Sequence, residues 1–133
     1  MSQAAMSVKN TLEWTIGQIA LPVRDVDRAV SFYRDVLGMK YLFSTAPGLA
    51  FFDCDGVRLM LSAPERPEFN HASSIIYFSV GDIQEAYASL VKRGVHFFDK
   101  PHVIHETESD TVWMAFFSDY DRNVLGLMSE VAK

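Results

Sequence analysis

The side chains best suited to chemistry gather in one short stretch of this 133-residue sequence. The segment DKPHVIHETESD, residues 99–110, contains His102, His105, Glu106 and Asp110. Imidazole nitrogens and carboxylate oxygens are common ligands for divalent metals, so the segment could form a metal site away from the strands. A stretch of this polarity is also typical of a solvated connection, or of a lid beside a cleft. The sequence leaves these alternatives open and favours the solvated connection.

Two isolated residues also deserve a chemical interpretation. Cys54 is the only cysteine, so no disulfide can form within the chain. It lies between Asp53 and Asp55, whose negative charges raise a thiol pKa, and we therefore predict a structural role for it. Gln18 is a polar residue inside an apolar stretch. Its amide could be satisfied by backbone or water, could orient a ligand, or could ligate a metal.

The elements that must position these residues occur twice. GQIALPVRDVDRAVSFYRDVLGM, residues 17–39, predicts a strand, a helix and a glycine stop, and residues 75–95 repeat the pattern. Asp25 and Asp82 lie 57 residues apart, and each is suited to cap its helix. Gly38 and Gly94 are suited to the left-handed turn that ends it, but they lie 56 residues apart. The second helix has therefore lost one residue.

Three strands are predicted after each helix. They are KYLFST, LAFFDC and VRLMLS in the first half, and VHFFDK, TVWMAFFS and NVLGLMS in the second. The predicted fold class is α+β, with two tandem βαβββ modules that form a curved mixed-sheet trough with helices outside. We place these modules at residues 14–62 and 74–131. Residues 63–73 form the predicted linker, and residues 1–13 a flexible tail.

Composition excludes several functional classes. The formal net charge is −5 and no basic run is present, which argues against a nucleic-acid surface. No apolar run is long enough for a membrane span or a signal peptide, so we expect no membrane partner and a cytoplasmic location.

Two motifs carry a family resemblance over residues 15–130. The first, V-x-D-h-x-x-A-x-x-F-Y-x-x-x-L-G, falls on Val23, Asp25, Ala29, Phe32, Tyr33, Leu37 and Gly38. The second, F-x-D-x-D-x-N, falls on Phe117, Asp119, Asp121 and Asn123. The sequence resembles the vicinal oxygen chelate superfamily, which includes glyoxalase I, bleomycin-resistance proteins and extradiol dioxygenases. The resemblance implies a divalent metal in the trough, held from four strand positions that are Gln18, Met60, Ile75 and Gly126 here.

These four residues are a poor ligand set. Only Gln18 offers a side-chain oxygen, whereas the methionine sulfur is soft and suits Cu(I). Isoleucine and glycine have no side-chain donor. We therefore predict no metal and no cofactor, and a trough that binds a small, partly apolar or aromatic molecule.

The alternation of side chains along strands predicts which residues line this trough. The predicted ligand-binding residues are Gln18, Arg58, Met60, Ile75, Tyr77, Met114, Phe116 and Gly126. Trp113, Ala115 and Phe117 are expected beneath the helices. An arginine on the inner face would need an anionic partner, so Arg58 could bind an acidic group of a ligand.

Other functions stay open at this point. The protein could be a glyoxalase-like lyase, an isomerase or a dioxygenase, with metal held by Gln18 and the histidines of residues 99–110. Metal-free acid–base chemistry would use Tyr77 or His102. A third alternative is a regulatory subunit whose trough a partner covers. We also expect a homodimer, because pairing would cover an exposed strand edge, either edge to edge or by exchange of modules. No catalytic residue is assigned.

Overall fold

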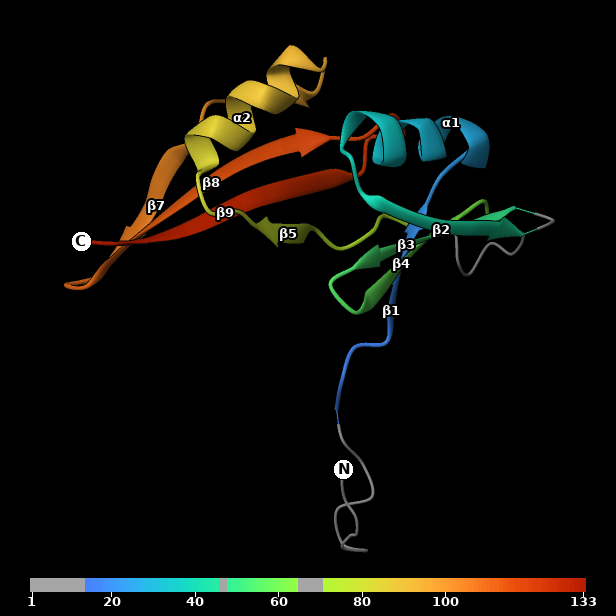
Figure 1. Cartoon of the computed structure of the whole chain (residues 1–133), viewed down its shortest axis with the longest axis horizontal. Coiled ribbons are helices and arrows are strands. Elements are labelled where there is room, and N and C mark those ends of the chain that lie inside the picture. Colours follow the sequence, from blue (N-terminus) through green and yellow to red (C-terminus); the bar gives the residue numbers. More distant parts are fainter. Residues whose placement is uncertain (1–13, 46–47, 65–70) are drawn as a thin grey trace, which may run out of the picture.

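The computed structural model describes residues 14–45, 48–64 and 71–133 (Figure 1). The predicted tail, residues 1–13, and residues 65–70 of the predicted linker lie outside the described residues. The chain forms two sheets that lie side by side, and the helices cover the same side of both.

The first sheet has the strand order β1-β4-β3-β2. Its elements are β1 (Gln18–Pro22), α1 (Val26–Val30), the π-helix η2 (Ser31–Val36), β2 (Lys40–Thr45), β3 (Leu49–Cys54) and β4 (Val57–Ser62). Strands β1 and β4 are parallel, whereas β4, β3 and β2 are antiparallel neighbours. The three strands predicted after the first helix are confirmed with their bounds.

The second sheet has the strand order β5-β9-β8-β6, and β7 also pairs with β8. Its elements are β5 (Ile76–Ser79), α2 (Ile83–Lys92), β6 (His96–Phe97), β7 (His102–Glu106), β8 (Asp110–Ser118) and β9 (Val124–Ala132). The predicted strand VHFFDK is reduced to the two residues of β6.

The interpretation of residues 99–110 as a solvated connection or lid is wrong. Five of these residues form β7, which pairs with β8 in antiparallel fashion. The nine-residue β8 is long enough to pair with β6 at one end and with β7 at the other. Pro101 lies between the two short strands, where its missing N–H cannot continue a ladder.

Both predicted helix caps are confirmed. The Asp25 carboxylate accepts the N–H of Arg28 at 3.2 Å, and the Asp82 carboxylate accepts the N–H of Glu85 at 3.1 Å. These bonds satisfy N–H groups that the first helical turn leaves without partners. Gly38, after the first helix, has a positive φ of 77°, which glycine adopts without strain.

The first helix changes from α to π geometry after one turn. The N–H of Leu37 donates to the carbonyl of Phe32, five residues earlier, at 2.9 Å. A π-turn accommodates one extra residue in a helix. The first helix has one residue more than the second between its cap and its glycine, so the π-turn accounts for the difference in spacing between the two repeats.

One hydrophobic core lies between the helices and both sheets. It combines residues of both halves, among them Leu21, Phe52, Leu59, Leu61, Ala115, Phe117, Leu125 and Leu127, each at most 4% exposed. Because side chains alternate along a strand, the neighbours of these residues lie on the opposite side of the sheets, away from the helices. We call that side the inner face.

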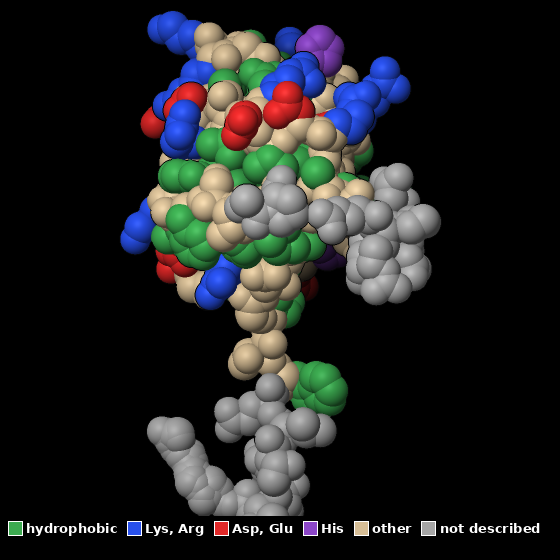
Figure 2. Space-filling view, turned by 90° about the vertical axis from the view of Figure 1, so that its right-hand side faces the viewer, with side chains coloured by type: hydrophobic (Ala, Val, Ile, Leu, Met, Phe, Trp, Pro, Cys, Tyr) green, Lys and Arg blue, Asp and Glu red, His purple; other side chains and the backbone are tan. Residues whose placement is uncertain are grey.

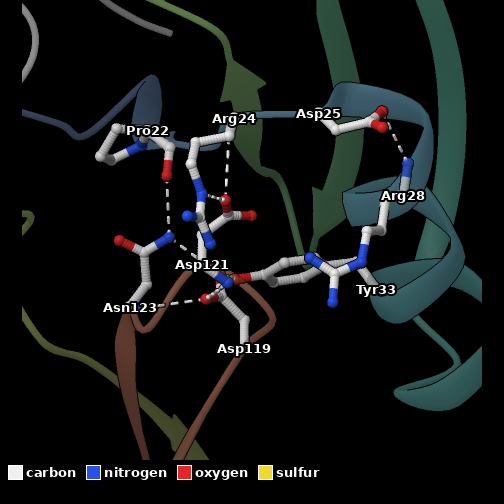
Figure 3. A network of polar contacts seen from close by, with 8 residues as sticks. All are labelled: Pro22, Arg24, Asp25, Arg28, Tyr33, Asp119, Asp121 and Asn123. Carbon is white, nitrogen blue, oxygen red and sulfur yellow. Dashed lines mark hydrogen bonds and ion pairs between the residues drawn. The ribbon is translucent and has the colours of Figure 1, made fainter.

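A buried polar cluster connects the two halves (Figure 3). The hydroxyl of Tyr33 in η2 donates to the Asp119 carboxylate at 2.7 Å. The Asn123 side-chain amide donates to the same carboxylate at 2.8 Å, and to the carbonyl of Pro22 at 2.9 Å. Since burial without partners would be costly, this set of bonds fixes the turn between β8 and β9 against the first half.

Burial and this cluster also affect ionisation. Burial raises the pKa of Tyr33 well above its ordinary value, and the negative charge of Asp119 raises it further. At the rim of the cluster, the Asp121 carboxylate accepts the backbone N–H of Arg24 at 2.9 Å and pairs with its side chain at 3.2 Å.

Candidate functional site on the inner face

The inner face of the first sheet carries a row of paired side chains. Gln18 lies opposite Arg58, and Ala20 lies opposite Met60 in the β1–β4 ladder. Since Leu59 and Leu61 are buried beneath the helices, Arg58 and Met60 point to the inner face. The Gln18 amide nitrogen lies 3.6 Å from the Met60 sulfur, which is a weak acceptor.

The inner face of the second sheet is built from aromatic and sulfur-containing side chains. Ala115 and Phe117 are buried beneath the helices, as predicted, so Met114 and Phe116 lie on the inner face. Tyr77 of β5 packs edge-on against Phe116, with the ring centroids 5.8 Å apart. Tyr77 is still 44% exposed, so this aromatic pair is accessible.

The four positions that the family resemblance assigns to a metal do not fit a divalent cation. A side chain at Gly126 would place its first carbon 3.1 Å from a ring carbon of Tyr77 and 3.2 Å from one of Phe116. These contacts are tighter than ordinary packing, so the two rings fill the space that a ligand side chain would need. Gln18 is left as the one oxygen donor among the four residues.

The alternative metal site in residues 99–110 also finds no support. The described residues contain no group of three or more His, Cys, Asp or Glu side chains that could hold a metal ion. His102 instead makes a 2.9 Å hydrogen bond between its Nδ1 and the carbonyl of Lys100. Acid–base roles for Tyr77 or His102 remain predictions.

A pocket of about 740 Å³ lies over the inner face of the first sheet, and we call it the first-sheet pocket. Its described lining residues come from β1, β3 and β4, from the turn before β3, and from the segments on either side of residues 65–70. They are Ile19, Ala20, Leu21, Pro22, Gly48, Leu49, Met60, Ser62, Ala63, Pro64, His71, Ser73 and Ser74. Its described residues are mainly apolar and include a few hydroxyl groups and one imidazole.

Two further pockets adjoin it in the described part of the chain. One of about 470 Å³ brings Arg58 and Tyr77 together with Asp53, and one of about 910 Å³ is lined by Ile75 beside Arg24. Arg58, Met60, Ile75 and Tyr77 are thus divided among three pockets instead of sharing one trough. Gln18, Met114, Phe116 and Gly126 line none of the three.

The structure adds residues that sequence reasoning missed. His71 and Ser73 border the first-sheet pocket, yet both belong to the predicted linker, where no periodicity marks a face. Leu49 also lines the pocket, and the alternation in LAFFDC could have identified it.

The surroundings of Arg58 and Cys54 bear on the roles predicted for them. The guanidinium of Arg58 lies 5.6 Å from the centroid of the Phe51 ring, and none of the ion pairs among the described residues includes it. Burial and, secondarily, the charge of Asp53 raise the pKa of the Cys54 thiol. A thiol in this environment is a poor nucleophile, as its sequence neighbours predicted.

No helix in the described ranges has the length and apolarity required to cross a membrane.

Solved structures with the same fold come from several bacteria. TnmS3, an antibiotic binding protein from Streptomyces sp. CB03234, is 25% identical with a TM-score of 0.73; the match covers 90% of this chain and 98% of that one. Lactoylglutathione lyase from Agrobacterium tumefaciens is 21% identical with a TM-score of 0.72, covering 89% and 95%. A superfamily member from Sphaerobacter thermophilus is 24% identical with a TM-score of 0.72, covering 88% and 98%.

No curated protein matches the chain. The model of the glyoxalase/bleomycin resistance protein/dioxygenase superfamily matches residues 15–127, which include both strand–helix repeats and most of both sheets. The chain therefore belongs to the glyoxalase/bleomycin resistance protein/dioxygenase superfamily.

Proposed function

We propose that this protein binds a small, partly apolar or aromatic molecule in the first-sheet pocket, and that binding needs no metal. The observation that carries the proposal is the pocket itself, about 740 Å³ over Ala20, Leu49 and Met60 of the inner face. Binding sites for small molecules commonly have volumes of about 300–1,000 Å³, apolar walls and a few polar groups. The similarity to TnmS3, an antibiotic binding protein, supports a role in binding.

The donor chemistry supports the metal-free part of the proposal. Met60, which stands where the family resemblance implies a metal ligand, contributes an apolar side chain to the pocket wall. At Gly126, the corresponding position of the second half, aromatic rings occupy the space that a ligand side chain would need.

We include homodimerisation in the proposal, because β1 and β5 each pair with one strand among the described residues and Tyr77 is exposed on the inner face.

The test is calorimetric titration with 1-naphthol and indole, in the presence and absence of EDTA. We expect saturable binding that EDTA does not change. Ala20→Phe should fill the pocket and weaken binding at least about tenfold, since the added ring competes for the same space. Ala88→Phe on α2, also at an exposed alanine, is the matched control and should bind as the wild type does.

Three results would overturn the proposal. They are the absence of saturable binding for both probes, equal binding by wild type and Ala20→Phe, and binding that EDTA abolishes and added metal restores. The last result would favour the enzymatic alternative with a metal held by unexpected residues. Thermal unfolding of both variants would establish that each remains folded.

A further inference from the structure

The first-sheet pocket adjoins a larger pocket of about 910 Å³ that contains arginine side chains. The two pockets share part of their wall, namely Pro22, Ala63, Pro64, His71 and Ser73. The larger pocket adds Arg24, which follows β1, and Asp121 and Arg122 of the β8–β9 turn. We call it the arginine pocket. A molecule seated in the first-sheet pocket can therefore extend past the common wall toward these charged residues.

Arg24 is held in place before any ligand binds. Its backbone N–H donates to the Asp121 carboxylate at 2.9 Å, and its Nε donates to the same oxygen at 3.2 Å (Figure 3). Asp121 is fixed in turn, because its own N–H donates to the buried Asp119 carboxylate at 2.8 Å. The Arg24 side chain is still 78% exposed, and a guanidinium group has five N–H donors. Arg24 can thus bind a second acceptor without leaving Asp121.

Arg122 has a backbone conformation that does not suit arginine. Its φ is 66°, in the left-handed region where a Cβ crowds the backbone and which glycine adopts without strain. The turn is held in this form by two bonds to Asp119, from the N–H of Arg122 to its carbonyl at 3.3 Å and from the N–H of Asn123 to its carboxylate at 2.8 Å. Strained residues of this kind gather at binding sites, and Arg122 lines the arginine pocket.

We infer that the arginine pocket binds the oxyanion group of the molecule whose apolar part lies in the first-sheet pocket, with Arg24 and Arg122 as the donors. Guanidinium groups bind carboxylates and phosphates through paired, charge-assisted hydrogen bonds, which are stronger than those between neutral groups. This inference rests on the proposed function and names the class of its ligand, an apolar or aromatic acid. An amide of the same shape carries no charge and should bind more weakly.

The experiment compares three probes with one ring system, each titrated calorimetrically near neutral pH. They are 4-(1-naphthyl)butanoate, the corresponding primary amide, and 3-(1-naphthyl)propyl phosphate. We expect at least one of the two anions to bind at least about tenfold more tightly than the amide, as charge-assisted hydrogen bonds predict. The anion that binds more tightly identifies the oxyanion as a carboxylate or a phosphate.

Variants at Arg122 test the assignment of the donor. Arg122→Asn removes the charge but suits the left-handed backbone, and should reduce the preference for the anion to less than about threefold. Arg122→Gly should lose the same preference and yet unfold at a higher urea concentration, because it relieves the strain at φ 66°. A purely structural role for Arg122 would not give this combination. Lys92→Gln on α2 is the matched control, since it removes one exposed positive charge outside both pockets and should keep the preference.

The outcomes separate the inference from the proposed function. If none of the three probes binds, the proposed function fails and the inference fails with it. If the amide binds as tightly as both anions, or if Arg122→Asn keeps the preference for the anion, only the inference is overturned. The first-sheet pocket then remains a binding site whose ligand does not use the arginine pocket.

Discussion

At the scale of single residues, Asp119 connects the two halves of the chain. The residue is 6% exposed, and its carboxylate accepts the Tyr33 hydroxyl, the Asn123 side-chain amide and two backbone N–H groups of the β8–β9 turn. Four donors around one buried carboxylate compensate for its lost hydration. The F-x-D-x-D-x-N motif therefore acts as a structural connection between the two halves.

Tyr33→Phe removes one of these donors and should lower the free energy of unfolding by about 1.5–3 kcal/mol near neutral pH. Burial raises the pKa of Tyr33 in the folded protein, so its stabilising contribution is complete below its ordinary value near 10. Above that pH the unfolded chain releases the proton first, and the contribution declines. Urea unfolding of wild type and variant from neutral to about pH 11 should show their difference shrink above pH 10.

The control for this series is Tyr87→Phe, because no hydrogen bond among the described residues involves the Tyr87 hydroxyl. A difference between wild type and Tyr33→Phe that stays constant up to pH 11 would contradict the assigned role of the hydroxyl.

At the scale of elements, aromatic packing on β9 fills the space that a metal-ligand side chain at Gly126 would need. Gly126 lies opposite Tyr77 on one side and Phe116 on the other, so two rings from neighbouring strands close over it. The absence of a side chain at this position allows the two aromatic rings to meet. The second sheet thereby has a packed aromatic inner face instead of a metal ligand.

Gly126→Ala should cost about 1 kcal/mol of stability, because the new carbon would lie 3.1 Å from Tyr77 and 3.2 Å from Phe116. In the double variant with Tyr77→Ala, most of the stability lost to this close contact should be recovered. A double-mutant cycle by urea unfolding measures this recovery as a coupling energy. Gly17→Ala is the control, since a carbon added there meets nothing within 4 Å. Equal stability of Gly126→Ala and wild type would mean that the rings move aside freely.

At the scale of the whole molecule, the single chain leaves apolar surface uncovered. Figure 2 shows hydrophobic side chains in a band across the end of the first half, with charged side chains gathered above it. Phe43 in β2 is 45% exposed and Tyr77 in β5 is 44% exposed. Among the described residues β1 and β5 each pair with one strand only, and together with this surface their edges favour association with a second copy.

We therefore expect light scattering coupled to size-exclusion chromatography to give a mass twice that of the 15.0 kDa chain. Ala20→Lys places a charge on the inner face at β1, an edge strand of its sheet as described, and should shift the equilibrium toward monomer at least about tenfold in dissociation constant. Gln84→Lys on α2 adds the same charge to the helix side and should leave the mass unchanged. A wild-type mass of one chain at high protein concentration would exclude the dimer.

The sequence by itself determined the parts of this protein that depend on local chemistry. The repeat, the capping residues Asp25 and Asp82, and the glycine turns follow from side chains and their near neighbours, so they could be predicted. The alternation of side chains along a strand likewise predicted that Ala115 and Phe117 lie beneath the helices and that Met114 and Phe116 lie on the opposite face. The poor donor set at the four expected metal positions was also visible from residue types alone.

Only the tertiary structure decided where a pocket lies and which strands pair. Strand β7 exists because the nine-residue β8 extends far enough to pair with it, and nothing within residues 99–110 contains that information. The first-sheet pocket combines Met60 of β4 with His71 and Ser73, which sequence analysis assigned to a linker. Such contacts join residues that share no periodic sequence pattern, because they depend on how separate elements pack rather than on how one segment folds.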